Sequence, residues 1–296
     1  MKNIFTILAL TIGFSMNAQD FWFQGTAPDA IQTNFASASG NYSIATGGYT
    51  TASGYNSTAM GIGTTASGSY STAMGKNTTA SGDVSTAMGG YTEASGEYSI
   101  AMGYDTTASG YNSTAMGSWT EASRYASTAM GRKTTASGDY STAMGYDTRA
   151  SGFNSTAMGY ITTASGSSST AMGDGTTASG NYSTAMGFST EASGYASTAM
   201  GFGTTASGYR STAMGNSTTA SGDYSTAMGR STTASDFGSL VIGQYNSSGS
   251  SVTSDATSFN IANTAFVIGN GTNSSNTSDA FKVMFNGDAT LSNDLT

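Results

Sequence analysis

A fourteen-residue repeat constrains the fold of this chain more than any other feature. Ser-x-Ala-x-Gly begins at Ser43 and returns every fourteen residues, nearly unchanged as Ser-Thr-Ala-Met-Gly through 57–229. A second half, Thr-x-Ala-Ser-Gly, is offset by seven residues and runs through 50–236 in the same rhythm. Such strict periodicity is typical of repeat proteins, in which each repeat is one small unit that packs on its neighbours. We therefore expect about fifteen copies of one unit within residues 36–243.

The composition excludes the two helical explanations of such a period. A Gly in nearly every seven residues would cost about 1 kcal/mol each in a helix, and Thr is a poor helix former. A collagen helix requires Gly at every third position and abundant Pro, whereas this chain has a single Pro. The remaining solution is two short strands per repeat, each ended by a Gly turn, stacked about 4.8 Å apart as a parallel β-solenoid. The predicted fold class is therefore all-β.

Differences between the copies indicate which side chains face water. The second position of the Thr-x-Ala-Ser-Gly half is usually Thr and becomes charged in four copies, Glu93, Glu121, Arg149 and Glu191. Charged side chains are almost never buried without a partner, so this position should face solvent. Strand alternation then places Ser53 outward, and Thr50 and Ala52 inward.

The other half of the repeat predicts an interior lined by methionine. The variants at its Thr and Met positions are mostly apolar: Ile44, Ile100, Leu240 and Ile242. We therefore expect Thr58 and Met60 to face inward, with Ser57 and Ala59 on the opposite face. The predicted core residues are the methionines at fourteen-residue intervals: Met60, Met74, Met88, Met102, Met116, Met130, Met144, Met158, Met172, Met186, Met200, Met214 and Met228.

The Ser-Thr-Ala-Met-Gly half shows no charged residue on either of its faces in any copy. We expect its sheet to be covered on both sides, by its own coil on one side and by another chain on the other. Small Ser and Ala side chains would let two backbones approach closely there. The chain is thus predicted to form a homotrimer or another small oligomer.

The ends of the chain differ from the repeats. Residues 1–19 read as a secretory signal peptide, with Lys2 before an apolar run and a small-residue cleavage site, so we expect secretion. Residues 20–35, including Phe21-Trp22-Phe23, are predicted to cap the first coil. Residues 244–296 are predicted to form an insertion, a last coil and a C-terminal cap or connector, with a strand that ends at an Asn286-Gly287 turn.

Residue types that usually carry catalysis are missing. The chain has no His and no Cys, which removes the common general base, the thiol nucleophile and many metal sites. We expect no enzymatic activity, cofactor, metal or small-molecule substrate. Seventeen acidic against nine basic residues give a net charge of −8, which argues against a nucleic-acid partner.

Aromatic residues gather in the variable dipeptides that follow each Gly. We expect these tips to be exposed, and they supply the candidate surface contacts Tyr55, Tyr98, Tyr140, Tyr182 and Tyr209. Such rings could stack on sugars or pack against a protein partner. The alternative is that they shield the backbone of the turns.

Ser-x-Ala-x-Gly repeated twice in fourteen residues resembles the heads of trimeric autotransporter adhesins of the YadA type. Ser43-Ile44-Ala45-Thr46-Gly47 and Ser239-Leu240-Val241-Ile242-Gly243 lie nearest to that family's pattern, and the resemblance covers about residues 36–269. It implies a left-handed parallel β-roll, three intertwined chains, and an adhesive head at the outer membrane surface of a bacterium. Its partner would be an extracellular protein or glycan.

Two other functions remain open. The outward row of Thr51 and Ser53, then Thr65 and Ser67, would present hydroxyls at about the 4.8 Å spacing of the coils and could bind ice. The same stack could also serve as a structural spacer in a surface fibre.

Overall fold

The computed structural model describes residues 23–27, 29–249 and 251–292. The predicted signal peptide and the residues Phe21 and Trp22 lie outside this range. All regular elements of the described residues are β-strands. A helix able to cross a membrane is not found in this part of the chain.

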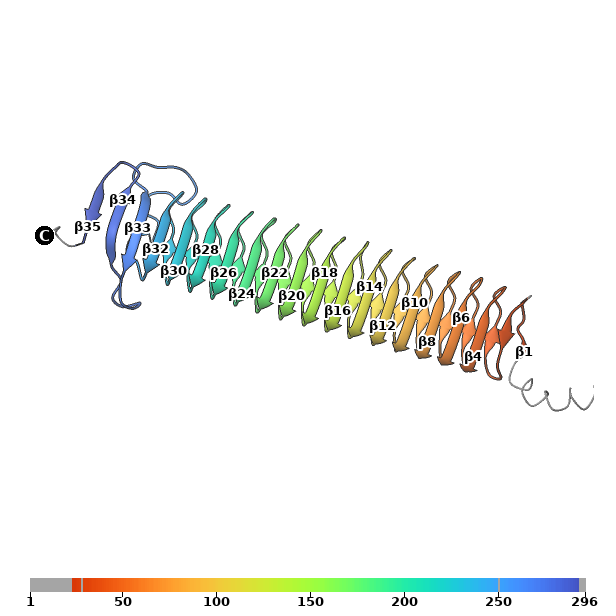
Figure 1. Ribbon diagram of the computed structural model, residues 1–296. Helices are drawn as coiled ribbons and strands as arrows, with labels where there is room; N and C mark the ends of the chain where they lie inside the picture. The colour runs from red at the N-terminus through yellow and green to blue at the C-terminus, as the bar shows by residue number, and fades with distance from the viewer. Residues whose placement is uncertain (1–22, 28, 250, 293–296) are drawn as a thin grey trace, which may run out of the picture. The chain divides into compact units, whose positions relative to one another are not determined.

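The chain forms two compact units, Met1–Lys133 and Thr134–Thr296. In each unit, the coils of the fourteen-residue repeat contribute one strand of five residues and one of two residues, which we call the long and the short strand. Figure 1 shows the long strands as successive arrows within each unit. Long strands pair in parallel with long strands, and short strands with short strands. The prediction of a parallel β-solenoid with a fourteen-residue coil is confirmed.

The first unit begins with an antiparallel pair, β1 (Phe23–Gln24) and β2 (Ile31–Gln32), and β2 pairs in parallel with the first long strand. Its long strands are β4 (Ile44–Gly48), β6 (Thr58–Ile62), β8 (Thr72–Lys76), β10 (Thr86–Gly90), β12 (Ile100–Tyr104), β14 (Thr114–Ser118) and β16 (Thr128–Arg132). Its short strands are β3 (Ser37–Ala38), β5 (Thr51–Ala52), β7 (Thr65–Ala66), β9 (Thr79–Ala80), β11 (Glu93–Ala94), β13 (Thr107–Ala108) and β15 (Glu121–Ala122).

The second unit has the same alternation of long and short strands, and its last long strand, β33, has seven residues. Its long strands are β18 (Thr142–Tyr146), β20 (Thr156–Tyr160), β22 (Thr170–Asp174), β24 (Thr184–Phe188), β26 (Thr198–Phe202), β28 (Thr212–Asn216), β30 (Thr226–Arg230), β32 (Leu240–Gln244) and β33 (Thr264–Asn270). Its short strands are β17 (Thr135–Ala136), β19 (Arg149–Ala150), β21 (Thr163–Ala164), β23 (Thr177–Ala178), β25 (Glu191–Ala192), β27 (Thr205–Ala206), β29 (Thr219–Ala220) and β31 (Thr233–Ala234).

Equivalent residues of successive coils stand in register. Met88 pairs with Met102, and Met158 pairs with Met172, each fourteen residues apart. Each type of side chain therefore forms a row that runs along the stack.

The interior of the repeated coils is built mainly from Ala, Ser and Thr side chains. Ala59 of the long strand, Ser57 just before it and Ala52 of the short strand are fully buried, and Thr50 is 1 % exposed. Several of the buried Ser hydroxyls close the neighbouring turn, as where Ser141 Oγ donates to the Gly138 carbonyl oxygen at 2.6 Å. The inward direction predicted for Thr50 and Ala52 is confirmed, and Glu93 and Arg149 are exposed as predicted.

The predicted methionine core is wrong. Met60 is 38 % exposed, and Thr58 lies beside it on the outer face of the long-strand sheet. The remaining members of the predicted core are half-buried, none fully: Met74, Met88, Met102, Met116, Met130, Met144, Met158, Met172, Met186, Met200, Met214 and Met228. The physical reason is space, because an interior filled by Ala and Ser has no room for an unbranched four-atom side chain.

Two kinds of glycine serve different purposes. Gly61 has a φ of +129°, a left-handed conformation that favours Gly. Gly54 does not have a positive φ. A Cβ there would instead lie 2.0 Å from the carbonyl oxygen of Gly68 in the next coil, so this turn requires Gly for close approach.

The coil stack ends in an antiparallel addition. β33 pairs in parallel with β32, and then β34 (Asp279–Met284) and β35 (Ala289–Leu291) follow as antiparallel strands. The segment between β32 and β33 is anchored by Asp236, whose buried carboxylate accepts the N–H groups of Thr253 at 2.6 Å and Thr264 at 2.7 Å.

Candidate interaction surfaces

The outer face of the long-strand sheet, which we call the Met face, carries the Thr and Met rows. In the described long strands from β4 to β33, no charged residue occupies either row. Where the residue differs from Thr or Met it is usually apolar, as at Ile44, Ile100 and Leu240. These two rows are therefore periodic and uncharged in each unit. The last residue of the long strand is charged in four coils, at Lys76, Arg132, Asp174 and Arg230.

The Met face becomes strongly apolar at the end of the second unit. Leu240 pairs with Phe266, which pairs in turn with Val283, and directly paired residues share one face of a sheet. Phe281 stands opposite Ile268, and its ring centroid lies 6.1 Å from that of Phe266. These side chains are half-buried within the chain itself. Together they form an apolar patch that continues the Thr and Met rows.

The outer face of the short-strand sheet has the opposite character. It presents rows of Thr and Ser, with the Thr row interrupted in the four copies that carry charge. Glu93, Arg149 and Glu191 are all exposed there. This face is solvated along both units.

The third surface is formed by the turn tips, and the five candidate Tyr residues all lie on it. We call the two residues after Ser-Gly the Ser-Gly turn and the two after Met-Gly the Met-Gly turn. Tyr182 is 56 % exposed and Tyr55 is 45 % exposed, whereas Tyr209 is half-buried. The structure brings each candidate against an aromatic ring of a neighbouring coil: Tyr55–Tyr70, Tyr98–Tyr111, Tyr140–Phe153, Tyr182–Tyr195 and Tyr195–Tyr209 are among these pairs.

Ring geometry depends on the positions that the two aromatic residues occupy in their turns. When both stand first in the turn, fourteen residues apart, the rings are stacked, as for Tyr195 and Tyr209 at 5.1 Å and 8°. When one stands first and the other second, the spacing is thirteen or fifteen residues and the rings meet edge to face, as for Tyr182 and Tyr195 at 66°. Contacts of both kinds stabilise the stack. They also occupy ring faces, which limits the stacking of sugars on these tyrosines.

Two ionisable groups have displaced pKa values, one in a turn and one in the C-terminal segment. Partial burial raises the pKa of the Tyr111 phenol, and the Glu97 carboxylate raises it further. Tyr111 is therefore protonated and neutral at neutral pH. In the C-terminal segment, N–H groups of Thr257 and Ser258 donate to the Asp255 carboxylate and lower its pKa.

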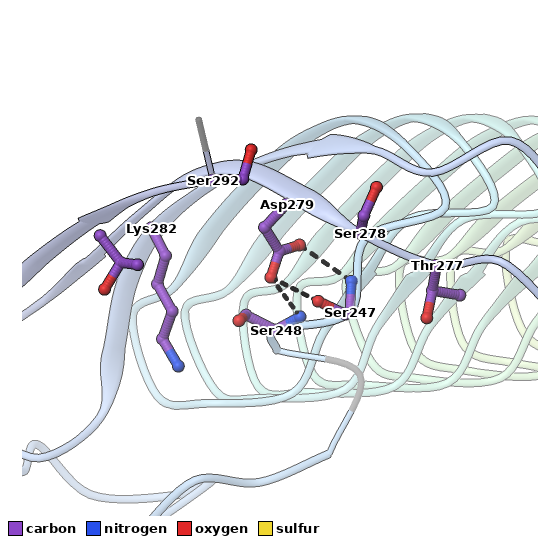
Figure 2. A pocket seen from close by; sticks show the side chains of 8 residues that line it. Ser247, Ser248, Thr277, Ser278, Asp279, Lys282 and Ser292 are labelled. Atoms are coloured by element: carbon purple, nitrogen blue, oxygen red, sulfur yellow. Dashed lines mark hydrogen bonds between the residues drawn. The ribbon is translucent and has the colours of Figure 1, made fainter. Parts of the chain in front are cut away.

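A polar cavity of about 470 Å³ lies beside β34 (Figure 2). It is lined by hydroxyls and two charged groups: Ser247, Ser248, Thr277, Ser278, Asp279, Lys282, Thr290 and Ser292. The Asp279 carboxylate accepts the Ser247 N–H at 2.8 Å, the Ser247 hydroxyl at 2.7 Å and the Ser248 N–H at 2.7 Å. These bonds tie the start of the insertion to β34, so the carboxylate has a structural role. In the described part of the chain, no group of three or more Asp or Glu residues could hold a metal ion.

Comparison with protein families agrees with this architecture. A family model described as the YadA head domain repeat matches residues 34–50, 52–78, 66–92, 80–106, 94–118, 122–148, 150–176, 164–190, 178–204, 192–218, 206–232 and 220–246. The chain belongs to the YadA head family. YadA heads are adhesin-type domains, and the family is not an enzyme family. The comparison with individual curated proteins finds none that matches the chain.

Sequence reasoning missed the direction of the Met face and the apolar patch that continues it. A usable signal was present, because the Ala of Ser-Thr-Ala-Met-Gly varies only to Val241 within the repeats while its neighbours change size more freely. Constancy of a small residue marks a narrow interior. Phe266 and Phe281 are neighbours because β33 pairs antiparallel with β34. Both strands follow the long insertion, so the repeat does not predict this pairing.

Proposed function

We propose that this chain is the non-enzymatic head of a secreted or cell-surface adhesin, associated with the outer membrane, that assembles as a homotrimer. It attaches to an extracellular protein or glycan through a repeated surface. Family membership supports the adhesin class. In this proposal residues 1–19 direct secretion, 20–35 cap the stack, 36–243 form the repeat region, and 244–296 form the insertion, last coil and connector.

The Met face is the observation that carries the proposal. Complete burial of one Met side chain contributes about 1.5–3 kcal/mol, and here most of these side chains are only half-buried by their own chain. The apolar patch at Phe266, Ile268 and Phe281 adds to the same face. Contiguous exposed apolar surface of this kind is typical of an interface.

A second copy of the chain is the partner that fits this face. A symmetry axis parallel to the stack brings equal coils of identical chains to the same level, so their rows match at every coil. Thr and Met rows without charge also avoid like-charge repulsion between these rows when identical surfaces meet. The sequence predicts that this sheet is covered by another chain, with Ser57 and Ala59 facing that chain. The proposal keeps the covering chain, but the side chains that face it are those of Thr58 and Met60.

Adhesion is then assigned to the surfaces that assembly leaves free, the turn tips and the outer face of the short-strand sheet. Each contact recurs at every coil, so weak individual contacts would add up by avidity. The polar cavity beside Lys282 is one further place where a glycan hydroxyl or acidic group could bind.

The test is attachment of beads coated with the full chain to cells, matrix proteins and immobilised glycans. We expect attachment by the wild-type chain and much weaker attachment by Met158→Glu, in which assembly and therefore avidity are reduced. Thr163→Glu is the control for an added carboxylate, because Glu93 and Glu191 occupy the same position in other coils and the change affects only one of the repeated contacts of that face. Absence of attachment to every surface, from a chain shown to be folded, would contradict the proposal.

Ice binding is the weaker alternative. The outward Thr row is half-buried and in register along each unit, as in the pairing of Thr51 with Thr65, but Glu93 and Arg149 interrupt it. A charged side chain disrupts a flat face of hydroxyls and methyls. Thermal hysteresis at micromolar chain concentration would support this alternative, and a trimer without attachment or hysteresis would favour a structural spacer.

A further inference from the structure

Three pairs of stacked tyrosines lie along the turns. The ring centroids of Tyr111 and Tyr125 are 5.3 Å apart with an interplanar angle of 4°. Tyr146 and Tyr160 are 5.2 Å apart at 13°, and Tyr195 and Tyr209 are 5.1 Å apart at 8°. In every pair both residues stand first in their turns and are separated by fourteen residues. Near-parallel rings on equivalent backbone positions place their equivalent carbons opposite each other.

We infer that these three pairs are sites of covalent modification, at which oxidation joins the two phenols of a pair through their ortho carbons as dityrosine. Each phenol loses one electron and one proton to the oxidant and becomes a phenoxyl radical. The two radicals form one carbon–carbon bond, and the ring hydrogens on the joined carbons move to the phenolic oxygens, which restores both aromatic rings. The pair has then lost two hydrogen atoms, and one peroxide accepts them to give two water molecules.

The surroundings of the pairs suit this chemistry. Tyr111, Tyr125, Tyr160 and Tyr195 are 42–48 % exposed, so an oxidant reaches them from solvent. Edge-to-face pairs such as Tyr98–Tyr111, at 73°, set the edge of one ring against the face of the other, so their ortho carbons are less well matched. Phe188 and Phe202 stack at 5.0 Å and 7° but have no phenol to oxidise. Ring geometry and phenol chemistry coincide only at the three tyrosine pairs among the described residues.

The consequence is a covalent cross-link between successive coils. The chain has no Cys and therefore no disulfide, whereas a secreted protein experiences an oxidising environment. A cross-link between residues fourteen apart restricts the unfolded chain much as a short disulfide loop does. This inference does not depend on the adhesive function or on the number of chains in the assembly.

The test is treatment of the full folded chain with hydrogen peroxide and a haem peroxidase, followed by peptide mapping and dityrosine fluorescence. Trypsin cleaves after Arg124 and after Arg149, so cross-links Tyr111–Tyr125 and Tyr146–Tyr160 each join two separate peptides. We expect both joined species, together with a loss of two hydrogens in the peptide that contains Tyr195 and Tyr209. Tyr195→Phe should abolish that last product while the ring stack is kept.

A gain of cross-linking gives the sharper test. The double substitution Glu97→Tyr with Tyr98→Asn moves one phenol from the second to the first position of its turn, fourteen residues from Tyr111. We expect a new cross-link between positions 97 and 111 that the wild-type pair Tyr98–Tyr111 does not form. Equal coupling at edge-to-face pairs, or coupling mainly between different chains, would overturn the inference.

Discussion

The two sheets of each coil share one interior but differ on their outer faces. The short-strand sheet carries Glu93, Arg149 and Glu191 outward, and all three are exposed. The long-strand sheet carries no charge in its Thr and Met rows and ends in the apolar patch around Phe266 and Phe281. The difference teaches that a row that tolerates charge faces solvent, whereas the rows that vary in size but never in charge are those that we propose to be covered by another chain.

A substitution in the interior, which both sheets share, is predicted to have the largest effect on stability. Ala157 is fully buried between the sheets, where a carboxylate has neither room nor a partner. We expect Ala157→Glu to lower the free energy of unfolding by about 3–5 kcal/mol or more, because it buries an uncompensated charge. Denaturant unfolding followed by circular dichroism measures this. A stability equal to that of Thr163→Glu would show that the interior has been assigned wrongly.

A charge placed on the Met face should disrupt the assembly of chains and change the stability of the single chain only slightly. We expect Met158→Glu to dissociate the assembly, because each chain would bring a carboxylate into the shared interface. The free energy of unfolding of the single chain should change by less than about 0.5 kcal/mol, as for other surface substitutions. Sedimentation velocity and denaturant unfolding separate the two effects. An intact assembly in this variant would mean that the Met face is not the interface.

Gly152 tests the close approach of successive turns. A Cβ at this position would lie 2.0 Å from the Gly166 carbonyl oxygen. We expect Gly152→Ala to cost about 1–3 kcal/mol by overpacking. Gly48→Ala is the matched control, because a Cβ there meets no atom within 4 Å and should leave the midpoint of thermal unfolding nearly unchanged.

The smallest effect is expected on the solvated face. Thr163 occupies the same position as Arg149 and Glu191, so Thr163→Glu should change the free energy of unfolding by less than about 0.5 kcal/mol. It should also leave the assembly intact. Loss of assembly in this variant would indicate that chains meet through the short-strand sheet and that the Met face is the one exposed to solvent.

Much of the fold follows from the sequence, because the period and the turn residues act locally. The fourteen-residue coil, the two strands per coil and the outward direction of Thr51 were all predictable. The direction of Met60 was predicted wrongly, because apolar character alone does not distinguish an interior from an interface between chains, whereas the constancy of the neighbouring Ala does. Small Ala and Ser side chains make the coil narrow, so its interior has no room for Met60, which therefore faces outward. Spacings of thirteen, fourteen or fifteen residues between aromatic residues, by contrast, could have predicted the ring geometry at Tyr195 directly.

The molar mass of the folded chain in solution tests the central claim most directly, since the claim is that the Met face is covered by identical chains. Sedimentation equilibrium of the full chain at neutral pH gives this mass without calibration by shape. We predict three times the mass of one chain. A single-chain mass at micromolar concentration, from a sample whose circular dichroism shows folded β-structure, would contradict the account.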